Sequence, residues 1–158
     1  MMKNETNPYL ENNFMDKYPI LFQNKDKSMM ETCMCWGIEC PPGWYNILTD
    51  LCDKLEFLNE HLAKQFEFQI VADQVKEKYG YLHFYYSVRP FDVEIEEREN
   101  KYRMIDGIVH DLIAYAENKT MNICSVCGKD IYGDDIITSN CWIRFYCKKC
   151  AKENNVEQ

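Results

Sequence analysis

Histidine is scarce in this sequence, with 3 residues among 158, namely His61, His83 and His110. Zinc-dependent deaminases need a His-x-Glu motif and a Pro-Cys-x-x-Cys motif, and the chain has neither. A zinc-containing HNH-type nuclease would need histidines within its zinc module, whereas none lies between Cys124 and Cys150. A nucleophile–base pair and a phosphate-binding loop are missing as well. These absences favour a non-enzymatic protein, and an enzyme with a site assembled from scattered residues is kept as an alternative.

Long apolar segments and positive charge are also in short supply. No stretch approaches the roughly 18 apolar residues of a membrane span, and the N-terminal segment Met-Met-Lys-Asn-Glu-Thr-Asn-Pro lacks the apolar centre of a signal peptide. The chain has 18 Lys and Arg against 26 Asp and Glu, which gives a formal net charge of −8. A protein this acidic gains nothing overall from approaching a phosphate backbone. We therefore expect no membrane partner and no general nucleic-acid binding, and we keep binding at a local basic patch as an alternative.

Cysteine, in contrast, is abundant, and four of the cysteines form two closely spaced pairs. The pairs are Cys124-Ser-Val-Cys127 and Cys147-Lys-Lys-Cys150, which is the C-x2-C…C-x2-C spacing of a four-cysteine zinc site. Two residues between paired cysteines let one tight turn direct both sulfurs at the same ion, and Gly128 can take the positive φ that such a turn needs. Four thiolates also fill the tetrahedron that structural zinc prefers. The sequence therefore predicts a structural Zn²⁺ at these four residues, with a disulfide pair or inert thiols as the alternative.

A second metal site is conceivable further upstream. Its candidate ligands follow a C-x-C-x4-C-x11-C spacing that matches no common zinc module: Cys33, Cys35, Cys40 and Cys52. Cys52 also falls on the apolar face of an expected helix, where a free cysteine is simply a small hydrophobic residue. The total of nine cysteines is odd, and together with the zinc pattern it fits a reducing cytoplasm better than secretion.

Hydrophobic periodicity predicts one long helix followed by a β-hairpin. From Trp44 to Leu62 the apolar residues recur at steps of three and four, which indicates an amphipathic helix over about 43–64. The period then changes to two from Phe66 onward, with a bulge or break expected near residues 70–72. A turn at residues 76–80 leads into a return strand over 81–88. We expect one face of this hairpin to pack on the helix.

A second helix and the cysteine pairs complete the predicted organisation. Asp92 is a candidate N-cap, and a further apolar stripe predicts a helix over about 93–118. The fold class is thus α+β: a long amphipathic helix packed on an antiparallel hairpin or small sheet, then a second helix leading into a C-terminal zinc-ribbon or knuckle module. We expect a partly flexible arm at 1–28, a core domain at 29–120, and a four-cysteine zinc module at 121–158 packed on the core.

Two groups of residues are candidates for a binding surface. Tyr81, His83 and Tyr85 point to the same side of the return strand, because strand side chains alternate. They form either an open aromatic platform for a base or a partner, or a face covered by the N-terminal arm or the second helix. We favour the covered face, since exposed apolar patches are rare. The second group is a basic cluster that either contacts phosphate or balances the zinc–thiolate charge: Arg144, Lys148 and Lys149.

Two motifs and the cysteine pairs give the chain a recognisable character. The motifs are MCWGIECPPGWY at residues 34–45 and QVKEKYGYLHFYY at residues 74–86. Over residues 30–150 they resemble a family of uncharacterised small phage and prophage proteins. The resemblance implies an accessory protein of the bacterial host cytoplasm that binds a host protein, for instance to inhibit antiviral defence. A tyrosine-rich surface suits protein recognition. The alternative is a nucleotide or nucleic-acid binder that uses the aromatic strand face and the basic cluster.

Overall fold

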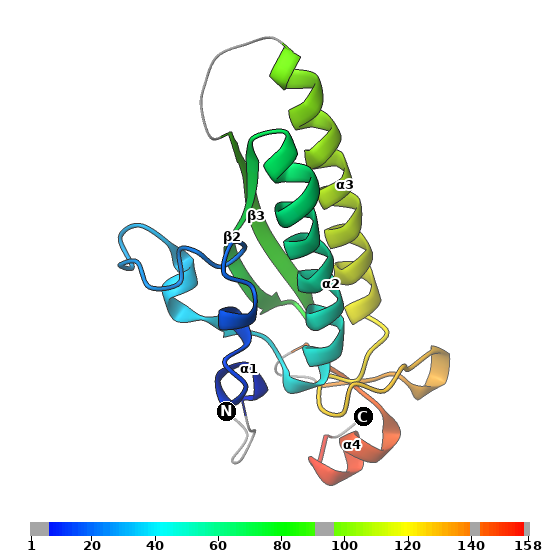
Figure 1. The fold of residues 1–158 in the computed structure, drawn as a ribbon. Coiled ribbons are helices and arrows are strands. Elements are labelled where there is room, and N and C mark those ends of the chain that lie inside the picture. Colours follow the sequence, from blue (N-terminus) through cyan, green and yellow to red (C-terminus); the bar gives the residue numbers. More distant parts are fainter. Residues whose placement is uncertain (1–6, 91–96, 140–142, 157–158) are drawn as a thin grey trace.

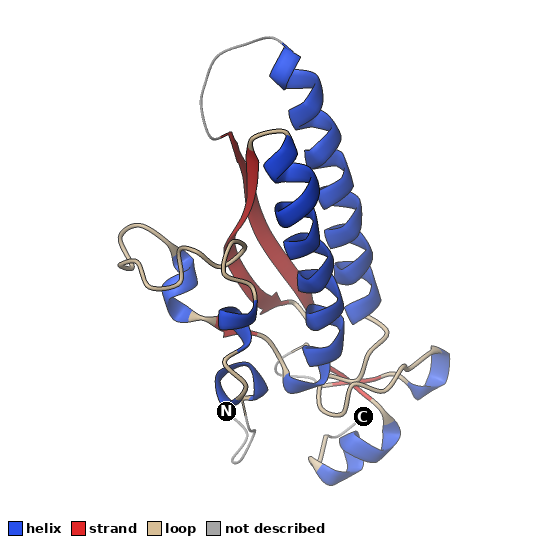
Figure 2. Ribbon diagram, viewed as in Figure 1, coloured by secondary structure: helices blue, strands red, loops and turns tan. Residues whose placement is uncertain are grey.

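Two long helices lie side by side across one face of a small β-sheet (Figure 1). The computed structural model describes residues 7–90, 97–139 and 143–156. The helices are α2 (Tyr45–Leu58) and α3 (Glu97–Thr120). The sheet has the order β1–β2–β3, in which β1 (Ile38–Glu39) is parallel to β2 (Phe68–Lys78) and β2 is antiparallel to β3 (Tyr81–Pro90). The fold is a mixed arrangement of helices and a small sheet (Figure 2), and a four-cysteine cluster lies near the C-terminus.

The β-hairpin is longer than the sequence predicts. Its turn consists of Tyr79 and Gly80 alone, at φ 56° and φ 88°, which fits the positive φ at both positions of a tight two-residue loop. The prediction of a turn over residues 76–80 is therefore wrong, because Lys76 and Lys78 pair with His83 and Tyr81 in the sheet. The charged side chains of Lys76 and Lys78 led to the prediction of a polar turn, whereas their backbone forms a regular strand.

An irregularity in β2 explains the change of parity in its sequence. The register with β3 shifts between Ala72 and Gln74, slightly later than the predicted position. An extra residue in one strand reverses which alternate side chains face the core. Ile70, Ala72 and Val75 can therefore all be buried, although they do not share one parity.

The helices end in contacts with the sheet. A π-helical turn at Asn59–Ala63 continues α2, and the Asn59 side chain both accepts from the Ile70 N–H (2.7 Å) and donates to the Ile70 carbonyl (2.9 Å). At the end of α3, Thr120 Oγ1 and Glu117 Oε1 accept the N–H groups of Leu82 and Phe84. These bonds satisfy backbone groups on the outer edge of β3 that would otherwise be free to pair with another strand. The predicted N-cap at residue 92 lies outside the described residues.

The N-terminal segment contributes to the main core despite its polar composition. It forms α1 (Pro8–Glu11) and a 3₁₀ turn at Phe14–Lys17, and the Leu21 carbonyl accepts the Ala72 N–H of β2 at 2.8 Å. The aromatic rings of this segment pack against one another at centroid distances of 5.2–6.3 Å. Five of its apolar side chains are buried: Tyr9, Phe14, Tyr18, Leu21 and Phe22.

One buried carboxylate attaches this segment to α2. Glu56 is 7% exposed, and its two oxygens accept the N–H groups of Ile20 and Leu21 at 2.9 Å each. We predict that Glu56→Ala lowers the free energy of unfolding by about 2–4 kcal/mol, because one buried and one half-buried N–H group lose a charged acceptor. Urea denaturation measures the loss. Glu60→Ala, which removes an exposed carboxylate from the same helical stretch, is the matched control, and an equal loss in both variants would contradict the assignment.

Candidate metal centre

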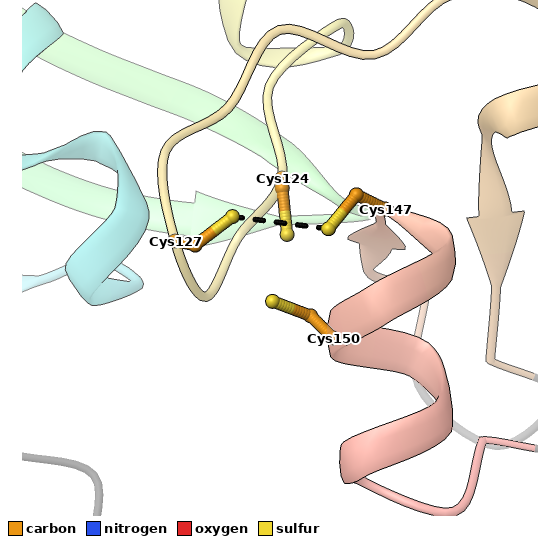
Figure 3. Close-up of side chains that lie close together, drawn as sticks. All are labelled: Cys124, Cys127, Cys147 and Cys150. Carbon is orange, nitrogen blue, oxygen red and sulfur yellow. Dashed lines mark hydrogen bonds between the residues drawn. The ribbon is translucent and has the colours of Figure 1, made fainter.

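The four paired cysteines come from two segments, the loop after α3 and the start of the last helix, which meet near one end of the helix pair (Figure 1). Cys124 and Cys127 lie in the loop that follows α3, where Gly128 takes the expected positive φ of 74°. Cys147 is the N-cap of the short helix α4 (Lys148–Glu153), and Cys150 lies in its first turn. Figure 3 shows the four side chains pointing toward one common centre.

The sulfur positions fit a single tetrahedral ion. All four Sγ atoms lie within 4.8 Å of one another, and Cys127 Sγ lies 3.8 Å from Cys147 Sγ. With Zn–S bonds of about 2.3 Å, a regular tetrahedron has sulfur–sulfur edges of about 3.8 Å. The cluster can therefore hold a metal ion, and its donor set and dimensions are consistent with zinc.

Backbone hydrogen bonds fix the two cysteine loops relative to each other. The Cys124 N–H donates to the Lys129 carbonyl, and the Gly128 N–H donates to the Cys124 carbonyl, at 2.8 and 2.9 Å. The Ser125 N–H donates across the module to the Phe145 carbonyl at 2.8 Å. Short strands β4 (Ile137–Thr138) and β5 (Phe145–Tyr146) pair antiparallel beside them. The four ligands are thus positioned by local structure and not by the side chains alone.

The protonation of the thiols is uneven across the cluster. Burial by itself would raise the pKa of the Cys147 thiol, but hydrogen bonds from the Cys150 backbone and from the neighbouring thiols outweigh it and lower that pKa to about 7. Burial raises the pKa of the Cys150 thiol, and its hydrogen bond to Cys147 raises it further. Metal binding requires thiolates and therefore releases the thiol protons. The Cys147 thiol, whose pKa is lowered, loses its proton readily.

The cysteine module is joined to the core through a contact between two glycines. The Gly43 N–H, in the segment that starts α2, donates to the Ser125 carbonyl at 2.9 Å. A Cβ atom on Gly43 would lie 2.2 Å from the Cys124 carbonyl oxygen, and a Cβ atom on Gly128 would lie 2.7 Å from the Gly43 carbonyl oxygen. Only glycine allows the two backbones to approach this closely. The role of Gly43 is not visible in the sequence, since nothing local to it signals a neighbour so distant along the chain.

The candidate ligands of a second metal site are not brought together. In the described parts of the chain, the C-terminal four-cysteine cluster is the only group of three or more His, Cys, Asp or Glu side chains whose ligand atoms converge. Cys33 is exposed, and the Cys35 thiol donates to the Thr32 carbonyl at 3.2 Å. Burial raises the pKa of the Cys40 and Cys52 thiols well above the usual value. These four cysteines therefore do not form a second cluster of metal ligands.

The aromatic face of β3 is partly open. The rings of Tyr81 and His83 lie 4.5 Å apart, and those of His83 and Tyr85 lie 6.1 Å apart and nearly parallel, at 14°. Tyr81 and His83 are half-buried, and Tyr85 is 45% exposed. The second helix does not cover this ladder, because α3 packs on the opposite face, toward Leu82 and Phe84. Of the two covers that we expected, the N-terminal arm and the second helix, the helix is therefore excluded.

The basic cluster is largely paired within the protein. Lys148 Nζ lies 2.6 Å from Asp135, whose pKa it lowers through a hydrogen bond and charge attraction. Lys149 Nζ lies 3.9 Å from Glu153, and Arg144 is half-buried. Part of the positive charge that the sequence offers for phosphate is therefore balanced by neighbouring carboxylates.

Comparison with known proteins supplies no relative. No protein-family model, curated protein or solved structure matches the chain. The geometry of the molecule itself is therefore the guide to its function.

None of the helices in the described parts of the chain has both the length and the apolar character needed to cross a bilayer.

Proposed function

We propose that the four cysteines hold a structural zinc ion and that the protein acts by binding another protein. The observation that carries the first part is the convergence of four sulfurs within 4.8 Å. Four thiolates complete the coordination of zinc, whereas a catalytic zinc keeps a position for water or substrate. One cysteine pair in a tight turn, the other at the start of α4, and the β4–β5 pair between them support a module of the zinc-ribbon or knuckle type.

The binding role is supported by the character of the surface. Exposed apolar and aromatic side chains occur on α2 and along one side of α3: Phe57, Met104, Ile108 and Tyr115. Such residues are enriched at protein contacts, and contiguous patches of them are rare on monomers without a partner. The resemblance to small phage proteins further suggests the partner: a host protein, bound in the bacterial cytoplasm to inhibit antiviral defence.

The proposal is tested by isolating the zinc-loaded protein and capturing its partner. The tagged chain is incubated with bacterial lysate, the captured protein is identified by mass spectrometry, and the complex is rebuilt from the two purified components. We expect one zinc per chain and stoichiometric binding in calorimetry. Substrate turnover at a water-ligated metal ion, or failure of every captured protein to bind after purification, would contradict the proposal.

The second candidate function is nucleotide or single-stranded nucleic-acid binding at the aromatic face. It is favoured by the nearly parallel His83 and Tyr85 rings and by Lys76, whose Nζ lies 5.8 Å from the centre of the Tyr85 ring. Rings provide stacking surfaces for bases, and a lysine beside them provides a cation for phosphate. Gel filtration with nucleotides and short DNA at two salt concentrations tests it, because this binding must weaken as salt rises.

A further inference from the structure

An open pocket lies on the outer side of the α2–α3 pair. Its volume is about 340 Å³, and it is lined by one residue of α3 and five of α2. The apolar floor comes from Leu58 and Leu112, and Phe57 stands at its side with 60% of its surface exposed. α2 and α3 run side by side along one face of the sheet (Figure 1), and the pocket has lining residues from both helices.

The exposed side of α3 extends this apolar surface. Met104, Ile108 and Tyr115 are 45%, 37% and 61% exposed, and their spacing places them in one stripe along the helix. Leu112 lies at the border of the stripe and also lines the pocket. The helix already buries a separate set of residues against the sheet, including Ile105 and Val109. The stripe is therefore a second apolar surface that the fold does not use.

Acidic side chains outnumber basic ones around the middle of this surface. Asp50 and Asp53 line the pocket, and Asp111 is exposed at the position on α3 that falls within the stripe. The one lysine of the pocket, Lys54, is held by Asp50 at 2.6 Å. Lys101 and Lys119 fall on the same side of α3 but near its two ends, and the Lys101 Nζ sits 5.5 Å from the Phe66 ring. The middle of the apolar surface thus faces solvent with an excess of negative charge.

We propose that the α2–α3 surface binds a cationic amphipathic helix of a partner protein. This inference rests on the proposed function and names the chemistry of the partner. A helix that lies in the furrow between two others presents residues at i, i+3, i+4 and i+7 to them, and its flanking lysines or arginines meet Asp50, Asp53 and Asp111. A second copy of the chain is a poor occupant, because each copy carries a net charge of −8 and the same acidic rim.

The test uses a synthetic helix as the probe. The peptide is about five turns long, with leucines at i, i+3, i+4 and i+7 and lysines elsewhere, and carries a fluorophore for anisotropy measurements. A peptide of the same composition with its leucines spread around the helix, and one with glutamates in place of lysines, are the controls. We expect saturable binding of the first peptide alone, weakening as salt rises.

Variants locate the binding site. Phe57→Ala and Ile108→Ala are expected to weaken binding about tenfold each, because each removes an apolar contact with the peptide. Asp53→Asn, which keeps an acceptor for the Tyr18 hydroxyl, is expected to reduce the salt dependence. Tyr132→Ala, which removes a similarly exposed aromatic ring from the C-terminal module, is expected to change nothing. Circular dichroism confirms that each variant is folded.

Three outcomes would overturn the inference. The first is that all three peptides bind equally well. The second is that Phe57→Ala and Ile108→Ala both bind the peptide as tightly as the unaltered protein. The third is that the protein sediments as a dimer and that Phe57→Ala dissociates this dimer. The captured partner separates this result from the proposed function. If it binds Phe57→Ala and Ile108→Ala as tightly as the unaltered protein, the docking surface is wrong while the binding role stands. If the peptide binds but no purified protein does, the binding role fails.

Discussion

Cys127→Ser is expected to abolish zinc binding and to unfold the C-terminal module. Structural zinc contributes on the order of 10 kcal/mol or more in small modules, while whole domains are stable by about 5–15 kcal/mol. The module has little else to hold it together, because its own core is a small cluster centred on Ile131, Tyr146 and Ala151. Cys127 is the one exposed ligand, so its substitution disturbs packing least and reports most directly on the metal.

The measurement combines metal content with local stability. Elemental analysis should fall from one zinc per chain to none, and hydrogen exchange should accelerate over residues 122–156. The main core, which extends from Tyr9 to Ile123, should keep its protection. Cys33→Ser, which alters an exposed cysteine outside the cluster, should behave like the unaltered protein. A Cys127→Ser protein that keeps its zinc and its full melting temperature would refute the assignment.

The four-cysteine cluster and the helices were predictable because their signals are local. Spacing within each cysteine pair reflects the geometry of one turn around an ion, and apolar residues at steps of three and four reflect one face of a helix. α2 (Tyr45–Leu58), with its 3₁₀ start and π-helical end, fills the range of about 43–64 predicted for the first helix. α3 (Glu97–Thr120) is close to the range of about 93–118 predicted for the second helix. These features require no knowledge of distant contacts.

The features that sequence reasoning missed depend on contacts between distant segments. The N-terminal segment has a polar composition. It is attached to α2 because the Glu56 carboxylate accepts the N–H groups of Ile20 and Leu21, which are far from Glu56 in the chain. The exposure of Tyr85 depends on which face of the sheet α3 covers. The part of β2 around Lys76 was predicted as a turn because its side chains are charged, although its backbone pairs with β3. The first two features depend on tertiary contacts, which hydrophobic periodicity does not report.

Gly43→Ala is expected to release the C-terminal module from the core while leaving zinc bound. The added Cβ atom would lie 2.2 Å from the Cys124 carbonyl oxygen and 2.7 Å from the backbone of Ser125. Those neighbours are backbone atoms, so the clash cannot be relieved by a change of rotamer. The two segments must separate, which also breaks the Gly43–Ser125 hydrogen bond of 2.9 Å. We expect a loss of about 3 kcal/mol or more in unfolding free energy.

A matched glycine substitution controls for the change in backbone entropy. Gly107 lies within α3 and has no atom within 4 Å of an added Cβ, so Gly107→Ala should stabilise the protein by about 0.5–1 kcal/mol. The opposite signs of the two alanine substitutions then isolate the steric contact at Gly43. Equal effects, or a Gly43→Ala protein of unchanged stability, would show that the close approach is not required.

The two large predictions together separate the role of the metal from the role of the interface. All four ligands belong to the module, so undocking at Gly43 leaves the sulfur cluster intact, whereas Cys127→Ser removes the ion that orders the whole module. Zinc content should therefore distinguish the variants, although both weaken the docking of the module on the core. If Gly43→Ala also loses its zinc, the core must help to order the cysteine loops, and the ion would then report the integrity of the entire fold.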